Sequence, residues 1–309
     1  MKIKRTMLFT TAFIISMSPF ILKRKNNENT NYLKHIKSIT KNIEDDDFLI
    51  SAHRGFSSLE IENTSDSISL AASKNYIDYI EIDARLTEDN KIVLSHNDLL
   101  IENNLPISIS SLSYECATTE SFHYQNYYIN PNLCTNPESK LIQKRKKKLD
   151  NKTYNLIGLK EGLELCGNKK VLVDIKFQDN KKEFTEELIR ELDGIDTSNI
   201  VFQSLDIDSL KYFKEKTNYN CLALINSKKD FKYIEDFDNF GIKSSLVSYK
   251  KVNKLIQEDK TIAVWTINTE EELELVTSKL KDYYDDVIYI TDNPDVIVTK
   301  LHDKQKTRD

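Results

Sequence analysis

The stretch FLISAHRGFSSLEIENTSDSISLAASKNYIDYIEID, residues 48–83, contains one complete unit of the predicted fold. It begins with a short apolar run, FLISAH (48–53), continues with a helical pattern over 64–74 and ends with a second apolar run, IDYIEID (77–83). Short apolar segments that alternate with helical patterns are typical of a parallel sheet whose strands are joined by crossover helices. This stretch therefore predicts a strand, a helix and a second strand.

The same alternation continues to residue 301. Further strands are predicted at VLVDIKF (171–177), NIVFQSL (199–205), CLALIN (221–226), SSLVSY (244–249), TIAVWTIN (261–268) and DVIYIT (286–291). Helical patterns lie at 159–166, 181–192, 207–216, 231–237, 250–257, 270–280 and 293–301. Eight strand–helix units over 48–301 predict an α/β fold, the (β/α)8 TIM barrel. A doubly wound open sheet is the alternative, but no glycine-rich turn follows the first strand, and the chain has only 6 Gly.

One long segment interrupts the alternation after the second strand. KIVLSH (91–96) is typical of an additional strand, and residues 97–157 then contain only scattered apolar residues. A connection of this length is uncommon in a compact domain, so we expect a functional insertion over one end of the barrel. The insertion contains the basic run KRKKK (144–148), which is either a solvated face or a site for an anionic partner.

The chain begins with a hydrophobic segment, TMLFTTAFIISMSPFIL (6–22), which carries no charge and has basic residues on both sides. Its length lies between that of a signal-peptide apolar region and that of a membrane-spanning helix. We therefore expect residues 1–25 to be a signal anchor or a signal peptide, with a buried helix as a third reading. The folded domain is then expected outside the cytoplasm, anchored in the cell membrane or, alternatively, secreted. A polar tether (26–47) and a polar tail (302–309) are predicted to flank it.

The charges are unevenly distributed. The 309 residues include 44 Lys+Arg and 49 Asp+Glu, a net charge of −5. Residues 1–25 hold 6 of the basic residues and no acidic one, so the rest of the chain has 38 basic against 49 acidic residues, a net charge of −11. An acidic main part argues against a nucleic-acid partner. With 39% hydrophobic residues and only 4 Cys, the chain is neither disordered nor a small disulfide-stapled protein.

Polar side chains recur where the predicted strands end. The residues concerned are His53, Arg54, Glu81, Asp83, His96, Asp174, Lys176 and Trp265. The active sites of TIM barrels are built at the C-terminal ends of the strands. We therefore expect these side chains to share one site.

Three of these residues are carboxylates. Glu81 and Asp83 are two positions apart on one predicted strand and therefore project to the same side of it. Together with Asp174 they offer hard oxygen ligands, which suit Mg²⁺ or Ca²⁺ better than Zn²⁺. An acidic pair at one strand end is common, so the prediction depends on its joint occurrence with the other polar strand ends.

Two cations and two imidazoles complete the set. Beside a divalent ion, Arg54 and Lys176 would offset the charge of a phosphate and the charge that develops on it during reaction. His53 and His96 can act as general base and general acid. Phosphoester cleavage uses such a set, whereas hydride and acyl transfer do not. Taken singly, His53 could be a core histidine, and Asp174 with Lys176 a surface ion pair.

The motifs HRG (53–55), ENT (62–64), EID (81–83), VWTIN (264–268) and ITDNPD (290–295), with a strand that ends in His96, are together highly specific. In this combination the chain resembles the glycerophosphodiester phosphodiesterase family over residues 48–301. The resemblance implies a TIM barrel that hydrolyses glycerophosphodiesters to glycerol 3-phosphate and an alcohol. It also implies a divalent metal cofactor, Ca²⁺ or Mg²⁺, and a small-molecule or lipid-derived phosphodiester as substrate.

Site roles follow from the resemblance by position. It implies that His53 and His96 form the catalytic acid–base pair. The residues implied to bind the metal are Glu81, Asp83 and Asp174, and those implied to contact the phosphate or the rest of the substrate are Arg54, Lys176, Glu62 and Trp265.

The chain departs from the family pattern at three positions. Asp174 stands where the third metal ligand is usually Glu, Asn97 follows His96 where Asp is usual, and Ile61 precedes ENT where Pro is usual. None of these changes removes a group that the mechanism needs. Two alternatives therefore stay open: a phospholipase-type enzyme acting on lysophospholipids or phosphoinositides at the membrane, and a surface binding module that has lost turnover.

Overall fold

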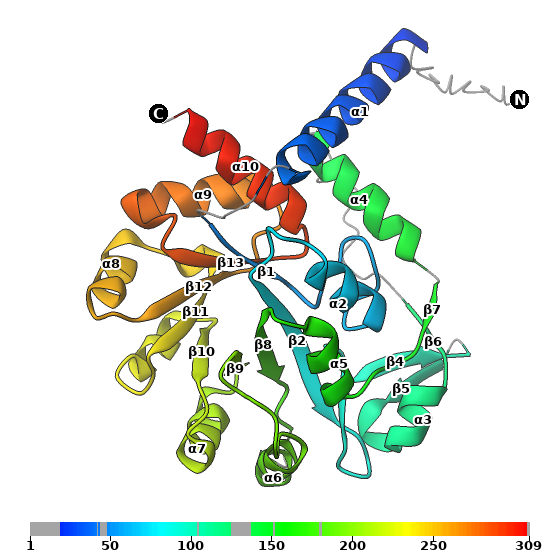
Figure 1. Ribbon diagram of the computed structural model, residues 1–309, viewed down its shortest axis with the longest axis vertical. Helices are drawn as coiled ribbons and strands as arrows, with labels where there is room; N and C mark the ends of the chain where they lie inside the picture. The colour runs from blue at the N-terminus through cyan, green and yellow to red at the C-terminus, as the bar shows by residue number, and fades with distance from the viewer. Residues whose placement is uncertain are drawn as a thin grey trace, which may run out of the picture.

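The chain forms a closed barrel of eight parallel strands surrounded by helices (Figure 1). The computed structural model describes residues 19–41, 43, 48–103, 105–124, 137–150, 152–178 and 181–307. The barrel strands, in spatial order, are β1 (Leu49–Ala52), β2 (Tyr79–Leu86), β8 (Lys170–Ile175), β9 (Ile200–Ser204), β10 (Cys221–Ile225), β11 (Asn239–Lys243), β12 (Thr261–Trp265) and β13 (Val287–Thr291). Pairing of β13 with β1 closes the barrel, which confirms the predicted TIM-barrel fold.

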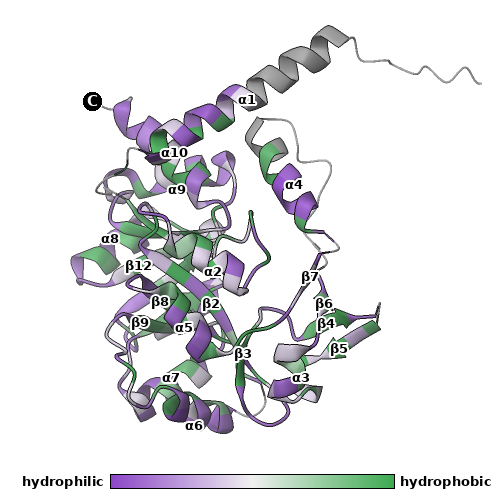
Figure 2. Cartoon of the chain, turned by 45° about the vertical axis from the view of Figure 1, so that its right-hand side comes forward, coloured by the Kyte–Doolittle hydropathy of each residue, from purple (hydrophilic) through white to green (hydrophobic). Residues whose placement is uncertain are grey.

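Helices cover the outside of the barrel. They are α2 (Ser65–Ala72), α5 (Leu159–Cys166), α6 (Lys181–Glu191), α7 (Ile207–Thr217), α8 (Tyr249–Gln257), α9 (Glu270–Leu280) and α10 (Pro294–Lys306). The larger apolar core lies between helices and strands, and a smaller cluster that includes Leu172, Leu222 and Ile288 fills the barrel. In Figure 2 the strands are largely hydrophobic and the helix faces that point outward are hydrophilic. Burial of these apolar faces is what holds the two layers together.

Two predicted elements are wrong. The strand predicted at 244–249 lies earlier, as β11, and Ser244–Leu246 is a 3-10 helix. Gly241 in β11 hides the strand pattern in the sequence, yet the barrel needs it, because a Cβ there would lie 2.5 Å from a methyl group of Leu224. The helix predicted at 231–237 is a 3-10 helix, Lys228–Tyr233. Further 3-10 turns occur at Ile109–Ser111 and Lys281–Tyr283.

The predicted insertion follows the second barrel strand. KIVLSH contributes β3 (Ile92–Leu94), which pairs antiparallel with β2. The segment beyond it contains β4 (Leu99–Glu102), β5 (Leu105–Ser108), α3 (Tyr114–Thr119), β6 (Phe122–His123), α4 (Pro137–Leu149) and β7 (Thr153–Tyr154). A separate small core, which includes Leu100, Phe122 and Leu156, joins the first part of the insertion to its C-terminal end.

The segment predicted to be a polar tether is largely helical. Helix α1 (Pro19–Lys41) lies against α10 and α4 (Figure 1). Ile36 is buried with Leu141 of α4 and Val296 of α10, and His35 Nε2 lies 2.9 Å from Asp303 Oδ2. The residues from 30 to 41 are therefore docked on the barrel and do not form a free linker. The predicted polar tail is also helical at first, because α10 continues to Lys306.

The hydrophobic segment 6–22 falls almost entirely outside the described residues, which begin at residue 19. Within the described part of the chain, no helix combines the length and the apolar character needed to cross a membrane. The signal anchor or signal peptide at 1–25 therefore stays a prediction.

Candidate active site

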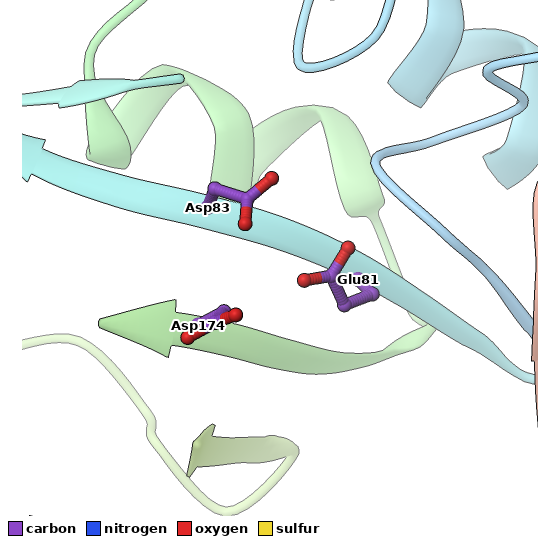
Figure 3. A group of neighbouring side chains, drawn as sticks. All are labelled: Glu81, Asp83 and Asp174. Carbon is purple, nitrogen blue, oxygen red and sulfur yellow. The ribbon is translucent and has the colours of Figure 1, made fainter. Parts of the chain in front are cut away.

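Three buried carboxylates lie together at the barrel wall. Glu81 and Asp83 project from β2, and Asp174 projects from the neighbouring strand β8 (Figure 3). Asp83 and Asp174 are direct register partners in the parallel pair of strands. One oxygen from each of the three carboxylates lies within 4.8 Å of the other two, and all three residues are buried. This arrangement could hold a metal ion.

The electrostatics of the cluster fit a cation. Burial raises the pKa of Glu81 well above its usual range, and the charges of Asp83 and Asp174 raise it further. Burial also raises the pKa of Asp174. The Oδ1 atom of Asp174 is buried and accepts no hydrogen bond from any described residue. A divalent ion at this point would satisfy that oxygen and relieve the repulsion between the carboxylates.

Two basic side chains lie against the same cluster. Lys176 Nζ is 2.8 Å from Asp83 Oδ1 and 2.5 Å from Asp174 Oδ2, while Arg54 Nε is 3.3 Å from Asp83 Oδ2. Burial would raise the pKa of Asp83, but the charges of Lys176 and Arg54 outweigh it and hold that pKa below its usual range. Burial would likewise lower the pKa of Lys176, yet Asp83 and Asp174 raise it. Both cations therefore stay charged beside the carboxylates.

The HRG motif forms the turn that brings Arg54 to the carboxylates. Arg54 has a left-handed backbone, with φ of 59°, and its amide donates a hydrogen bond to Glu81 Oε2 at 2.8 Å. Gly55 follows with φ of +75°, and a Cβ there would lie 2.7 Å from backbone and side-chain atoms of Ser67 in α2. Only glycine allows this close approach without a shift of the helix.

Each residue of the ENT motif has a separate task. Glu62 accepts two hydrogen bonds from Arg54 Nη1, at 3.0 and 3.1 Å, so it orients the guanidinium. Asn63 donates from its amide to Asp83 Oδ2 at 2.8 Å and accepts from the Asp83 backbone at 2.9 Å. Thr64 caps α2. The supporting contact of Asn63 was not among the sequence predictions, although the motif contains the residue.

His53 is held by a carboxylate that the sequence analysis did not single out. Its Nδ1 donates to Asp292 Oδ1 at 2.6 Å, since a carboxylate can only accept. Its Nε2 lies 3.9 Å from Glu81 Oε2, so the free edge of the ring faces the carboxylate cluster. Asp292 follows β13 directly and lies within the ITDNPD motif. This motif was the feature of the sequence that could have identified Asp292 as a site residue.

Asp292 has three side-chain partners among the described residues. Besides His53, its Oδ2 accepts from Asn268 Nδ2 and from Lys146 Nζ, both at 2.9 Å. Burial would raise the pKa of Asp292, but the charge of Lys146 and the contact with His53 hold it well below the usual range. Asp292 is therefore a charged, fully engaged partner of the imidazole.

His96 lies on the other side of the carboxylates, beyond β3. Its Nδ1 is 3.0 Å from Asn97 Oδ1, and Arg85 holds its backbone carbonyl with hydrogen bonds of 2.7 and 3.0 Å. Burial lowers the pKa of His96 to about 4, and the positive charges of Arg54 and Lys176 act in the same direction. This imidazole is therefore uncharged at neutral pH.

A pocket opens beside His96 between the barrel and the insertion. From the barrel side it is lined by Glu62, Asn63 and His96, and from the insertion by apolar and aromatic side chains that include Leu99, Leu100, Ile101, Tyr124 and Tyr154.

Trp265, predicted to belong to the site, lies on β12 across the barrel from β8. Its ring packs against the apolar cluster inside the barrel, and its Nε1 donates to the Gly241 carbonyl at 2.9 Å.

Of the residues predicted from the sequence, the structure brings together eight around the carboxylate cluster. They are His53, Arg54, Glu62, Glu81, Asp83, His96, Asp174 and Lys176. Trp265 contacts the apolar barrel interior instead. Asp292 and Lys146 were not predicted, and Asn63 and Asn268 lay within the motifs without an assigned role. Asn63 orients Asp83, Asp292 orients His53, and Asn268 and Lys146 hold Asp292.

The solved structures similar to this chain share its fold. A phosphodiesterase from Oleispira antarctica, in complex with the product sn-glycerol 3-phosphate, has 18% identity and a TM-score of 0.63, with 82% of this chain and 96% of that chain covered. A glycerophosphoryl diester phosphodiesterase-like protein from Silicibacter pomeroyi has 14% identity and a TM-score of 0.66, with coverage of 83% and 94%. The glycerophosphodiester phosphodiesterase of Thermotoga maritima has 20% identity and a TM-score of 0.56, with coverage of 81% and 97%.

No curated protein sequence matches the chain. The model of the glycerophosphoryl diester phosphodiesterase family, however, matches residues 53–296, which begin at the HRG motif and end just past ITDNPD. This match covers most of the chain and includes both imidazoles, the carboxylate cluster and Asp292. The chain therefore belongs to the glycerophosphoryl diester phosphodiesterase family.

Proposed function

We propose that the chain hydrolyses glycerophosphodiesters to glycerol 3-phosphate and an alcohol, with a divalent metal ion, Ca²⁺ or Mg²⁺, and acid–base catalysis by two histidines. The observation that carries the proposal is a buried carboxylate cluster with two cations against it and two imidazoles beside it. Family membership supports the reaction class. The product complex of the Oleispira antarctica enzyme supports glycerol phosphate as the common part of the substrate.

Glu81, Asp83 and Asp174 would hold the metal ion. When bound, the ion would draw negative charge from the phosphate oxygens. Arg54 and Lys176 lie against the same carboxylates, so a phosphodiester held there meets two further positive charges. These fixed charges would stabilise the charge that develops on the phosphate in the transition state.

The two imidazoles differ in a way that suggests their roles. His96 is uncharged at neutral pH, so its ring can accept the proton of the attacking hydroxyl. His53 is held at Nδ1 by the Asp292 carboxylate, which orients the ring, so Nε2 is placed to donate a proton to the leaving oxygen. The attacking hydroxyl belongs either to water or to a neighbouring position of the substrate.

The pocket beside His96 is where we place the alcohol part of the substrate. Its insertion wall combines aromatic and apolar side chains with two polar ones, Asn97 and His123. The hairpin of β4 and β5 also exposes two large apolar side chains, Leu99 at 60% and Leu105 at 69%. This exposure favours one second candidate, phospholipase-type cleavage of lysophospholipids or phosphoinositides, because exposed leucines next to a pocket suit an acyl chain or a membrane surface.

The place of action is also a proposal. The uncharged segment 6–22 with its basic flanks supports an anchor in the cell membrane, with the barrel outside the cytoplasm. A cleaved signal peptide and a secreted enzyme are the alternative. Expression of the full chain with a C-terminal tag, followed by membrane fractionation and N-terminal sequencing, distinguishes the two. A tagged protein found only in the cytosol would contradict both.

The function is tested by following glycerol 3-phosphate release from glycerophosphocholine and glycerophosphoglycerol in the presence of Ca²⁺ or Mg²⁺. We expect turnover that EDTA and His53→Ala abolish, and a parallel assay with lysophospholipids tests the second candidate. An exposed Lys147→Ala variant serves as the matched control. Full turnover in EDTA would refute the metal dependence. A chain that binds these diesters without turnover would be a binding module.

A further inference from the structure

The insertion helix α4 is fastened to the barrel at the point where β13 ends. Arg145 makes a bidentate ion pair with Asp295, with Nη1 to Oδ1 at 2.9 Å and Nη2 to Oδ2 at 2.5 Å. One turn earlier in α4, Leu141 is buried together with Val296 of α10 and Ile36 of α1. These contacts place the next residue, Lys146, directly over Asp292.

The two oxygens of the Asp292 carboxylate bind different donors. Its Oδ1 receives the short hydrogen bond from His53 Nδ1, and its Oδ2 receives Lys146 Nζ and Asn268 Nδ2. Lys146 and Asp292 expose only 16% and 13% of their side chains, so this ion pair is largely removed from water. A carboxylate with Oδ2 fixed by two donors cannot rotate, and Oδ1 then stays aimed at the imidazole.

We propose that Lys146 is a positioning residue for the reaction: from the insertion helix it fixes Asp292, and through Asp292 it holds the ring of His53 toward the carboxylate cluster. The inference rests on the proposed function of His53. It means that the barrel alone does not complete the acid–base machinery. A segment far away in the sequence supplies the last member of the chain from Lys146 to Asp292 to His53.

The basic run in which Lys146 lies divides into two kinds of residue. Arg145 and Lys146 are turned to the barrel and form ion pairs, whereas Lys144, Lys147 and Lys148 are exposed. The exposed neighbours provide matched controls on the same helix. A general loss of positive charge would affect all of them alike, but a positioning role belongs to Lys146 alone.

The kinetic test compares Lys146→Met, Lys146→Arg and Lys147→Met in the full chain with glycerophosphodiester substrate and saturating Mg²⁺ or Ca²⁺. We expect Lys146→Met to lower kcat by about tenfold or more with KM nearly unchanged, because orientation of a catalytic group affects the chemical step. Lys146→Arg should restore most of kcat, and Lys147→Met should behave as the unchanged chain. Overturning results are an unchanged kcat in Lys146→Met, or a rise in KM alone, which would make Lys146 a substrate contact.

A double-mutant cycle tests the path through Asp292. If Lys146 acts through this carboxylate, Lys146→Met should cause little further loss of kcat in an Asp292→Asn background. Full additivity of the two losses would overturn the inference. Thermal unfolding of each variant identifies any that fail to fold. If Lys146→Met is one of them, the kcat of Lys146→Arg is compared with that of the unmodified chain instead.

A second measurement needs no substrate. The Nδ1 proton of His53, in a short hydrogen bond to a carboxylate, should give a far-downfield proton resonance that is absent in Asp292→Asn. We expect this resonance to shift or broaden in Lys146→Met and to persist in Lys147→Met. An unchanged resonance in Lys146→Met would overturn the inference. Absence of turnover in the unmodified chain would instead refute the proposed function, so the two failures are distinguishable.

Discussion

The carboxylate cluster on β2 and β8 and the Asp292 group after β13 form two halves of the site that differ in how their charges are balanced. On the β2–β8 side, three carboxylates come from two adjacent strands and from positions close in register, and their charge exceeds what Arg54 and Lys176 supply. On the β13 side, Asp292 is matched by His53, Asn268 and Lys146, which come from three different parts of the chain. The first half could hold a metal ion, while the described partners of Asp292 in the second half are all protein side chains.

We therefore expect one half of the site to depend on metal and the other to depend on the folding of the insertion. If the β2–β8 half binds the proposed metal ion, its function should follow metal concentration. The β13 half needs only the correct placement of three segments, so its function should follow the integrity of the insertion and be indifferent to metal. The two halves should therefore fail independently.

Metal removal should have the largest effect. We expect EDTA to reduce glycerol 3-phosphate release to background, because the carboxylate cluster alone repels a phosphodiester. Added Ca²⁺ or Mg²⁺ should restore activity and raise the Tm of the unmodified chain, since a ligand that binds only the folded state stabilises it. The Tm of Asp83→Asn should respond much less. A metal-independent Tm in the unmodified chain would contradict the assignment of the cluster.

Asp292→Asn should have the next largest effect. Loss of the carboxylate removes the acceptor for His53 Nδ1, and we expect kcat to fall by about 10²- to 10⁴-fold. Metal affinity, measured by calorimetry, should stay close to that of the unmodified chain. A weakened metal site in this variant would show that the two halves are not independent.

Asn63→Ala should affect the carboxylate cluster and leave the Asp292 group unchanged. Asn63 orients the Asp83 carboxylate through two hydrogen bonds. Loss of such a supporting contact typically lowers metal affinity by about 10- to 100-fold. We therefore expect turnover at limiting metal to fall and to recover at saturating metal. A kcat that stays low at saturating metal would contradict a role confined to the metal half.

His96 should produce a pH effect on stability in the metal-free protein. Its pKa is lowered to about 4 by burial and by two nearby cations, so between about pH 6.5 and pH 4 the unfolded state binds more protons than the folded state. The free energy of unfolding should therefore decrease as pH falls through this window, by roughly 3 kcal/mol more in the unmodified chain than in His96→Gln. Urea unfolding at pH 7.5, 5.5 and 4 measures it, and equal pH dependence in both proteins would be the contrary result.

The smallest effect is expected at the exposed part of the basic run. Replacement of Lys144, Lys147 and Lys148 by Ala should change the free energy of unfolding by no more than about 0.5 kcal/mol each, as is usual for surface positions. Activity on soluble diesters should not change. A clear loss of activity would favour a site for an anionic partner on α4 over a solvated face.

Local signals in the sequence predicted most of the barrel. Seven barrel strands appear as apolar runs with polar ends, and β11 does not, because Gly241 divides a segment with only two apolar residues, Phe240 and Ile242. The carboxylate cluster was predictable for the same reason. Glu81 and Asp83 share one strand, and parallel strands place Asp174 at the same level.

The contacts of the β13 half were not predictable in this way. His53 and Asp292 are 239 positions apart, and Lys146 is separated from Asp292 by 146 positions. Nothing in a basic run shows which of its members will face inward, since the tertiary packing of α4 decides it. Likewise, Glu62 was expected at the substrate, and only the structure shows its pairing with Arg54.

Helix α1 links the start of the described chain to the insertion and to the last helix of the barrel. The helix is 23 residues long, which corresponds to about 34 Å of rise. Its C-terminal part shares an apolar contact with α4 and α10 (Figure 1), and α4 carries Lys146. The helix that carries Lys146 is therefore packed against the N-terminal helix as well as against the barrel, so changes in α1 that disturb this contact should also affect the placement of Lys146.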